Sequence, residues 1–484
     1  MHLRAAGVSV VLDASGGGVP SVVHWGSDLG DRLPSRETWR RAVPHSAIDS
    51  ASDLTLLPGG GGSQHEPVLQ GSRDDGGLVA DWRLVDVDVT GTSVAVRCLA
   101  ESAGVSVRTE LAMGAHGVLR VRHTVTNDGA TPYRLDRLAV ALPIPPEGTE
   151  LLDLTGRWCR ERHPQRHPFT AQGTWARTAR HGRTGHDATL LLMAGTAGFG
   201  NRHGQVWGLH LAWSGNHMTY AERRPDGRAV LAAGELLDAG EVVLAPGDEY
   251  TTPDVLAVTS DEGLDGLSRR LHGFARSRAG HPRRPRPAVL NTWEAVYFDH
   301  GLERLTALAD VAADVGVERF VLDDGWFLHR RDDRAGLGDW TVDPQVWPAG
   351  LGPLISHVRG LGMEFGLWVE PEMVNVDSDL YRAHPDWVLR AGDRLPVEWR
   401  HQQVLDLTVG DAFGHILDRL DALLRDHDIA FLKWDHNRDL IDAGHQGHPA
   451  VRAQTHAVYR LLDELRARHP TVEIESCASG GARV

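Results

Sequence analysis

Ala430-Phe-Leu-Lys-Trp-Asp-His-Asn437 shows the pattern that organises the C-terminal half of the chain. A short, mostly apolar run ends in polar residues, which here are Asp435 and Asn437. The pattern recurs after Pro287, and amphipathic helical segments separate several of the runs. This alternation predicts βα units around a parallel sheet. The expected strands are residues 288–293, 319–322, 364–369, 403–407, 430–434 and 472–476.

Polar side chains follow each expected strand, as a (β/α)8 barrel requires, because its active site forms at the carboxyl ends of the strands. We therefore expect a barrel domain over residues 288–484, with about six of eight units present. A dinucleotide-binding sheet is disfavoured, because the first strand leads into Asn-Thr-Trp-Glu rather than a Gly-x-Gly-x-x-Gly turn.

Residues 1–280 show a different pattern, with short runs of alternating apolar and polar residues between turn signals. In one run Leu119, Val121, His123 and Val125 alternate with polar residues, and similar runs cover residues 93–99, 105–111 and 206–213. This pattern predicts an antiparallel β domain. The basic, proline-containing segment 157–181 is expected to be a loop, and the Pro/Arg-rich segment 281–287 a linker.

The composition excludes several function classes. Asp plus Glu number 65 against 50 Lys plus Arg, which gives a formal net charge of -15 and argues against nucleic-acid binding. No run of apolar residues is long enough to span a membrane. The 3 cysteines are widely spaced, which excludes a disulfide framework and fits a reducing compartment. We therefore expect a cytoplasmic protein without a membrane partner.

Tryptophan and carboxylates together point to a sugar ligand. Trp makes up 15 of the 30 aromatic residues, and several stand next to Asp or Glu. Indole faces suit the C–H faces of a pyranose, and carboxylates suit its hydroxyls. Carboxylates gathered at one barrel mouth suit cleavage of a glycosidic bond. We expect Asp435 to be the nucleophile, because the Lys433 cation nearby favours its ionised form.

Five motifs, in this order, resemble glycoside hydrolase family 36, the bacterial α-galactosidases. They are Asn291-Thr-Trp-Glu-Ala, Phe320-Val-Leu-Asp-Asp-Gly-Trp-Phe327, Gly366-Leu-Trp-Val-Glu-Pro-Glu-Met373, Lys433-Trp-Asp-His-Asn-Arg438 and Glu475-Ser-Cys-Ala-Ser-Gly-Gly-Ala-Arg483. The resemblance implies an N-terminal β-supersandwich followed by a (β/α)8 barrel. It also implies retaining hydrolysis of terminal α-D-galactosides of the melibiose and raffinose type, with Asp435 as nucleophile and without a cofactor or metal.

The resemblance also assigns the contacts with the sugar. The paired aspartates would hold the 4- and 6-hydroxyls, the tryptophans would shape the subsite, and the Cys and Gly would line the pocket near the 2-position. The remaining three side chains would bind other hydroxyls. These residues are Trp293, Asp323, Asp324, Trp368, Arg400, Lys433, Asn437, Cys477 and Gly480. His436 replaces the commoner Met and is expected to point away from Asp435. Members of the family are often homo-tetramers, which we expect for the full-length protein.

The general acid/base is expected beyond Val484, because the resemblance places it after the Cys477 motif. We therefore expect this chain to be a fragment that ends after the sixth barrel strand and to be weakened or inactive as a catalyst. Activated aryl galactosides should then retain more activity than raffinose. The remaining nearby carboxylates, to which the resemblance gives no such role, are Glu370, Glu372, Asp406 and Glu475.

Four other functions stay open at this stage. A galactosyl transferase resembling raffinose synthase, or an α-N-acetylgalactosaminidase, would use the same framework. A metal-dependent hydrolase is suggested by His445 and His448, although no matching His pair stands at other strand ends. A non-catalytic sugar-binding protein is the fourth.

Overall fold

The computed structural model describes residues 1–31, 33, 54–59, 66–74, 76 and 80–482. The chain forms two compact units. The first contains Met1–Arg180 and Thr184–His281, and the second contains His181–Arg183 and Pro282–Val484. The boundary at His281 lies in the Pro/Arg-rich segment. The motif residue Arg483 and Val484 lie outside the described residues.

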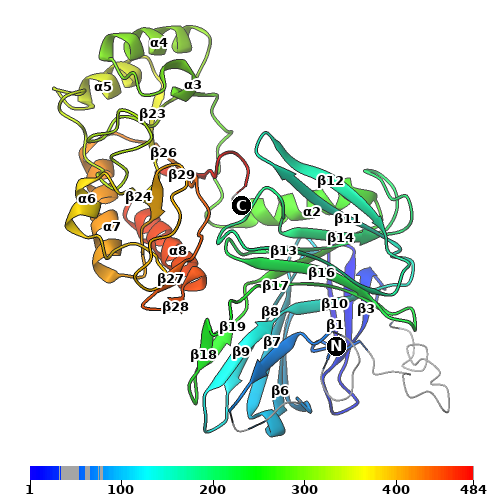
Figure 1. Cartoon of the computed structure of the whole chain (residues 1–484). Helices are drawn as coiled ribbons and strands as arrows, with labels where there is room; N and C mark the ends of the chain where they lie inside the picture. The colour runs from blue at the N-terminus through cyan, green and yellow to red at the C-terminus, as the bar shows by residue number, and fades with distance from the viewer. Residues whose placement is uncertain (32, 34–53, 60–65, 75, 77–79, 483–484) are drawn as a thin grey trace. The chain divides into compact units, whose positions relative to one another are not determined.

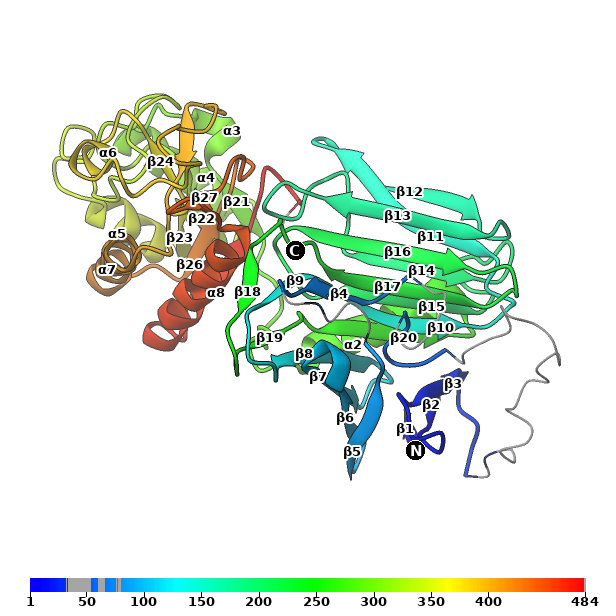
Figure 2. The same cartoon turned by 60° about the horizontal axis from the view of Figure 1, so that its bottom comes forward.

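The first unit is built from antiparallel sheets (Figures 1 and 2). In the largest, nine strands follow one path and a tenth, β19 (Glu249–Thr251), pairs with β8. In order along the path they are β12 (Arg160–Pro168), β11 (Glu150–Arg157), β14 (Leu191–Gly195), β15 (Val206–Leu211), β20 (Val255–Ser260), β8 (Leu119–Asn127), β7 (Val105–Met113), β6 (Ser93–Ala100) and β5 (Arg83–Thr90).

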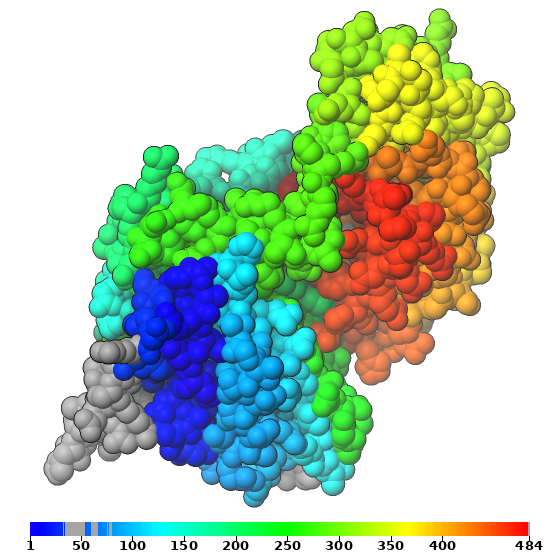
Figure 3. Space-filling model, turned by 180° about the vertical axis from the view of Figure 1, so that it is seen from behind, coloured from blue at the N-terminus to red at the C-terminus, as the bar shows by residue number. Residues whose placement is uncertain are grey.

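Three smaller sheets accompany the large one. The four-stranded sheet, seen in Figure 2, has the order β10 (Val140–Ile144), β17 (Ala229–Glu235), β16 (His217–Arg223) and β13 (Gly173–Ala179). The two three-stranded sheets contain β1 (His2–Ala5), β2 (Val8–Asp13) and β3 (Ser21–Ser27), and β18 (Val242–Leu244), β9 (Tyr133–Leu138) and β4 (Leu69–Ser72). In Figure 3 the N-terminal strands, in dark blue, lie beside the lighter blue segment that contains β5 to β7. The unit also contains the 3-10 turn η1 (Glu101–Ala103) and helix α2 (Gly263–Ser277).

The alternating pattern of β8 is confirmed. Leu119, Val121, His123 and Val125 are buried, whereas the residues between them are more exposed. Side chains of a strand point alternately to its two faces, so this sequence puts its apolar set into the core.

The expectation of a loop over residues 157–181 is wrong. The segment contains strands β12 and β13, which together cover most of it. β12 is an edge strand of the large sheet, with one strand neighbour. Proline and basic residues are tolerated on an edge strand because one row of its backbone groups does not pair. Composition alone therefore suggested a loop where the chain forms an edge.

The second unit contains a parallel sheet whose strands follow chain order. They are β21 (Val289–Asn291), β22 (Arg319–Leu322), β23 (Glu364–Val369), β26 (Phe431–Trp434) and β29 (Glu473–Ser476). All four neighbouring pairs are parallel. The predicted fold class, an antiparallel β domain followed by an α/β unit with a parallel sheet, is confirmed.

The expected strand over residues 403–407 does not join this sheet. Its first part forms β25 (Gln402–Val404), which pairs antiparallel with β24 (Met373–Asn375), and β23 pairs directly with β26. Backbone groups of Leu405 and Leu407 instead form hydrogen bonds with the side chain of Gln454. The amide of Leu407 donates to Oε1 of Gln454, and Nε2 of Gln454 donates to the carbonyl of Leu405, at 2.9 and 3.0 Å. The described sheet therefore has five parallel strands rather than six.

Ion pairs at both ends of the sheet show that it is curled. At the amino end, Nη2 of Arg319 on β22 lies 2.7 Å from Glu364 and 2.8 Å from Glu473 on β29, although two strands separate β22 from β29. At the carboxyl end, Lys433 on β26 reaches Asp323, which follows β22. A flat sheet would hold such strands too far apart, since neighbouring strands are about 4.8 Å apart.

Helices cover the sheet and supply its apolar packing. In this unit α4 packs beside α5, and α7 beside α8 (Figure 1). The core is continuous and includes Leu305, Phe320, Leu367, Ile416 and Leu461. The helices are α3 (Trp293–Val296), α4 (Leu302–Asp314), α5 (Gly352–Gly360), α6 (Asp379–Ala383), α7 (Gly410–Asp426) and α8 (Val451–Arg468), and the hairpin β27 (Gly444–His445) and β28 (His448–Pro449) precedes α8. Among the described helices, none is both long and apolar enough to cross a bilayer.

Gly366 allows β23 to pack closely inside the sheet. A Cβ at this position would lie 2.9 Å from Cγ2 of Val321 and 3.0 Å from Cδ1 of Phe431. We expect Gly366→Ala to lower the free energy of unfolding by about 1–3 kcal/mol, because neighbours in a packed core must shift. Urea denaturation measures this. Gly414→Ala in α7, where nothing lies within 4 Å, is the control and should leave stability equal or higher.

Candidate active site

An ion pair joins the carboxyl ends of two strands of the parallel sheet. Asp323 follows β22 and Lys433 is on β26, and Nζ of Lys433 lies 2.9 Å from Oδ2 of Asp323. Asn291, at the end of β21, donates to the same oxygen at 2.6 Å. Burial alone would lower the pKa of Lys433, but Asp323 raises it, so the ammonium group stays charged. The sheet thus brings together the expected residues Asp323 and Lys433.

Asp435 is buried, and its carboxylate accepts hydrogen bonds from four neutral N–H donors, in addition to the Cys477 thiol. Oδ2 accepts from Nε1 of Trp368 at 3.1 Å and from Nδ2 of Asn437 at 2.8 Å. Oδ1 accepts from the backbone amides of His436 at 2.9 Å and Ser479 at 3.4 Å. Among the described residues, none forms an ion pair with Asp435. Its carboxylate is therefore oriented without being neutralised by a direct cation.

The surroundings of Asp435 favour its ionised form. Burial alone would raise the pKa of Asp435, but the hydrogen bonds from Asn437, His436 and Cys477, together with the charge of Lys433, lower it below the ordinary value. The Cys477 thiol has the opposite shift, because burial and the charge of Asp435 raise its pKa to about 12. An ionised carboxylate beside a protonated thiol can act as a nucleophile or as an acceptor for hydroxyls.

Asp324 is held by a buried arginine. Nε and Nη2 of Arg330 donate to Oδ1 and Oδ2 of Asp324 at 2.9 and 2.8 Å, a bidentate pair in which both side chains are buried. Burial alone would lower the pKa of Arg330, but Asp324 raises it. A carboxylate oxygen can accept two hydrogen bonds, and Arg330 supplies one to each oxygen of Asp324. Asp324 therefore keeps acceptor capacity for a ligand. The backbone amide of Asp324 also donates to Oδ1 of Asp323 at 2.9 Å, which helps to fix the Asp323 carboxylate.

The aromatic residues have two different environments. Trp368 is buried and stacks on Phe327 with ring centroids 6.3 Å apart, so that only its indole N–H is directed to Asp435. Trp293, at the start of α3, is half-buried and makes edge contacts with Tyr297 and Phe298, both at 5.2 Å. Trp293 is therefore the more accessible ring for contact with a ligand.

The remaining expected residues are less closely joined to the site. Gly480 is exposed at φ 102°, and its backbone bonds to the Cys477 thiol, which places these two side by side after β29. Arg400 lies on an exposed loop and makes no hydrogen bond or ion pair with the other described residues. The charge of Arg400 is close enough to Glu370 to oppose the rise in the pKa of Glu370 that burial causes. His436 is directed to Glu372, with Nδ1 3.7 Å from Oε2, and away from Asp435, as expected.

Three residues of the site were not predicted to belong to it, and a fourth, Glu370, was predicted only as a nearby carboxylate without a role. Asn291 and Ser479 lie inside motifs that the sequence singles out, and each bonds to a predicted residue. Glu370 also lies in such a motif, and it accepts from the backbone amide of Asn437. Arg330 lies outside the motifs and donates to Asp324. An arginine six residues after an aspartate is too common to signal such a pair.

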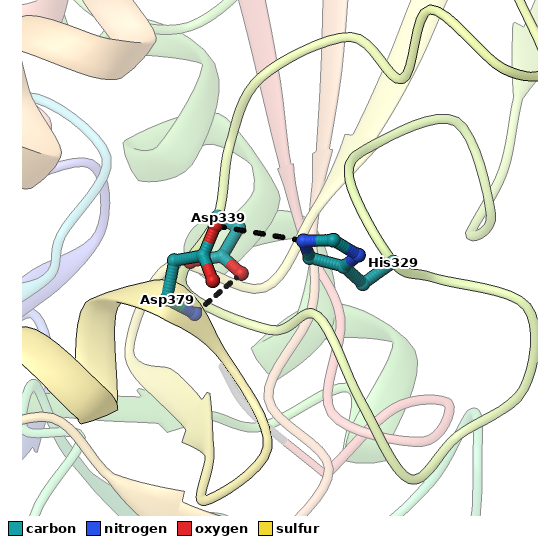
Figure 4. Close-up of side chains that lie close together, drawn as sticks. All are labelled: His329, Asp339 and Asp379. Atoms are coloured by element: carbon teal, nitrogen blue, oxygen red, sulfur yellow. Dashed lines mark hydrogen bonds and ion pairs between the residues drawn. The ribbon is translucent and has the colours of Figure 1, made fainter.

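A group of possible metal ligands lies elsewhere in the unit. Ligand atoms of His329, Asp339 and Asp379 are within 4.8 Å of one another (Figure 4). However, the oxygens of Asp339 accept from the backbone amides of Asp379 and Leu380, at 2.8 and 2.9 Å, at the start of α6. Asp379 is also paired with Arg382. These contacts explain the group as a cap for α6.

The histidines suggested as metal ligands have a different arrangement. His445 and His448 face each other across the hairpin of β27 and β28. Nδ1 of His445 lies 2.6 Å from Oδ2 of Asp406, and Oδ1 of Asp406 accepts from the Thr408 hydroxyl. Asp406 thus has partners of its own near this hairpin.

Comparison with known families and proteins gives consistent matches over both units. The model of the glycosyl hydrolase family 36 N-terminal domain matches residues 18–245, and the Melibiase model matches residues 249–484. An α-galactosidase of Escherichia coli is 42% identical over 96% of this chain and 66% of its own length. The α-galactosidase AgaA of Geobacillus stearothermophilus is 32% identical over 100% of this chain and 71% of its own length.

Solved structures give the same result. A variant of AgaA from Geobacillus stearothermophilus in complex with stachyose has a TM-score of 0.92 at 30% identity, covering 100% of this chain and 73% of that chain. The galactosidase domain of the α-galactosidase–sucrose kinase AgaSK, a protein of Mediterraneibacter gnavus, has a TM-score of 0.90 at 26% identity, covering 100% and 70%. By sequence and by fold, the chain belongs to glycoside hydrolase family 36.

Proposed function

We propose that this chain acts as a retaining α-galactosidase, which removes terminal α-D-galactose from galactosides of the melibiose and raffinose type. The observation that carries the proposal is the geometry of the buried Asp435 carboxylate, which four neutral N–H donors orient beside the Asp323–Lys433 pair. The names of the matched relatives support galactose as the sugar.

In the proposed first step, a carboxylate oxygen of Asp435 forms a bond to the anomeric carbon as the bond from that carbon to the leaving oxygen breaks. The leaving oxygen takes a proton from a general acid, and an ester of galactose with Asp435 results. Water then attacks the same carbon as the deprotonated form of the general acid takes one of its protons, and the ester bond breaks to give galactose and the free carboxylate. The two inversions give net retention of configuration.

The polar side chains around Asp435 are proposed to hold the sugar. Asp323 and Asp324 accept from the 4- and 6-hydroxyls, and Lys433 and Asn437 bind other hydroxyls. Asn291 holds the carboxylate of Asp323, and Arg330 holds that of Asp324. Because both carboxylates are already fixed, less entropy is lost when the sugar binds. Trp293 and Trp368 border the ring.

Cys477 and Gly480 are proposed to line the pocket near the 2-position. Arg400 is proposed to bind a hydroxyl and must then turn in from its exposed loop.

The test of the function is the configuration of the first product. Hydrolysis of an activated aryl α-galactoside should release α-galactose before mutarotation, as proton NMR measures. An aryl group that departs without protonation isolates the step performed by Asp435. Release of β-galactose first, or no release above the uncatalysed rate, would contradict the proposal.

The lowered pKa of Asp435 predicts a wide acid range for covalent labelling. A 2-fluoro galactosyl reagent with an activated leaving group should label the enzyme at a rate that is constant from about pH 7 to about pH 5, because Asp435 is still ionised there. The rate should fall only below the ordinary aspartate pKa. Mass spectrometry at several pH values measures it, and a halving of the rate near pH 6 would contradict the assignment.

The alternatives remain distinguishable by experiment. A transferase would form a new galactoside when an acceptor sugar is added, and an α-N-acetylgalactosaminidase would prefer the N-acetylated substrate. A sugar-binding protein without catalysis would bind galactose and not be labelled. A metal-dependent hydrolase would lose activity with a chelator.

We also propose a cytoplasmic location and assembly as a homo-tetramer. Light scattering of the purified protein tests the oligomer, and cell fractionation tests the location.

A further inference from the structure

Glu370 is a completely buried carboxyl group next to the proposed nucleophile. It follows β23 in the Glu370-Pro-Glu-Met373 motif. Its Oε1 accepts from the backbone amide of Asn437, and its Oε2 accepts from Nε2 of Gln402 at 3.1 Å. Asn437 in turn donates its side-chain amide to Asp435. Glu370 therefore connects to the nucleophile through one residue.

The partners of Glu370 differ from those of the other buried carboxylates at this edge of the sheet. Asp323 is paired with Lys433, and Asp324 with Arg330. Among the described residues, no Lys, Arg or His forms an ion pair with Glu370. A buried carboxylate without a cation is energetically costly, and such a group commonly takes up a proton.

The nearby Asp435 adds to this effect. Two carboxyl groups in one buried site repel each other when both are ionised, so that one of them holds the proton. Asp435 accepts from four N–H donors and from the Cys477 thiol, whereas Glu370 accepts from Asn437 and Gln402, which favours ionisation of Asp435. Burial first, and then the charge of Asp435, raise the pKa of Glu370 to about 8. The charged groups that act on Glu370 are Asp435, which raises its pKa, and Arg400 and Arg330, whose charges oppose this.

We infer that Glu370 is a positioning residue that works as a neutral carboxylic acid. It fixes the amide of Asn437, and through Asn437 the carboxylate of Asp435, without adding a second negative charge beside the nucleophile. The inference rests on the proposed function for its role, although the protonation state can be tested separately.

The surroundings of Glu370 can accommodate the proton. The carbonyl oxygen of the neutral acid accepts from Asn437, and the hydroxyl can donate to Gln402 once the Gln402 amide is turned by half a rotation. The oxygen and nitrogen of an amide are assigned from such networks, so both orientations are compatible with the same shape. A glutamine at position 370 would make the same two bonds.

Thermal unfolding as a function of pH tests the protonation state without any substrate. A folded pKa above the unfolded value means that the folded chain binds more protons between the two values, so that stability falls as pH rises through that window. The melting temperature of the wild type minus that of Glu370→Gln should therefore fall from about pH 4.5 to about pH 8 and be constant above that. A difference that is flat, or that favours the wild type as pH rises, would overturn the neutral acid.

Covalent labelling tests the positioning role. With the activated 2-fluoro galactosyl reagent at pH 7, Glu370→Gln should label within about three-fold of the wild type, and Glu370→Ala about 10–100-fold more slowly, because the nucleophile loses its fixed orientation. Equal labelling rates for Glu370→Ala and the wild type would overturn the positioning role. If Glu370→Gln lost as much labelling rate as Glu370→Ala, the charge of Glu370 would be needed, and the neutral acid would be wrong. If the wild type is not labelled at all, the proposed function fails, while the pH dependence of melting still decides the protonation state.

Discussion

Asp435→Asn is expected to abolish formation of the galactosyl enzyme and to reduce hydrolysis of an activated aryl α-galactoside by at least about 10³-fold. The amide has the shape of the carboxylate but lacks an ionised oxygen to attack the anomeric carbon. In the wild type, the indole N–H of Trp368 and the backbone N–H of His436 donate to different oxygens of the carboxylate. In the variant, one of these two donors would face the NH₂ group of the asparagine. Steady-state kinetics and mass spectrometry measure the two effects.

The control for this variant is Asp442→Asn, in the loop that follows the nucleophile. Asp442 is exposed and paired with Arg394 at 2.7 Å, and exposed pairs contribute little to stability. Its activity should equal that of the wild type. If Asp435→Asn kept activity within ten-fold of the wild type while folded, Asp435 would not be the nucleophile.

Arg330→Ala is expected to lower the free energy of unfolding by about 3–5 kcal/mol, because it leaves the buried Asp324 carboxylate without its cation. Chemical denaturation measures the loss. The double variant Arg330→Ala with Asp324→Asn should recover part of it, since no buried charge then remains unpaired.

Arg304→Ala provides the matched control, because Arg304 and Asp299 form an exposed pair. It should change the unfolding free energy by no more than about 1 kcal/mol. An Arg330→Ala protein as stable as this control would show that the bidentate pair with Asp324 contributes little.

The sequence predicts the strands whose burial depends on local pattern. The runs at 319–322, 364–369 and 430–434 are apolar and are followed by polar residues, and each forms a parallel strand. The run at 403–407 looks the same locally, but Gln454 on α8 takes up its backbone groups. That side chain lies far along the sequence, so no local pattern reveals the contact.

The candidate site was predictable to a similar extent. Asp323, Lys433, Asp435 and Asn437 stand at strand ends, and the parallel sheet brings them together for that reason. Arg330 and Glu370 could not be assigned, because their roles depend on which carboxylate or amide the folded chain places against them. Burial and pairing, which set their protonation, are properties of the fold rather than of the motif.

The most direct measurement is the mass of the peptide that contains Asp435 after incubation with the activated 2-fluoro galactosyl reagent. The structure predicts one galactosyl adduct on the side chain of Asp435, formed at a rate that free galactose slows by competition. An adduct on another carboxylate, or none when the protein is folded and binds galactose, would contradict the assignment of the nucleophile.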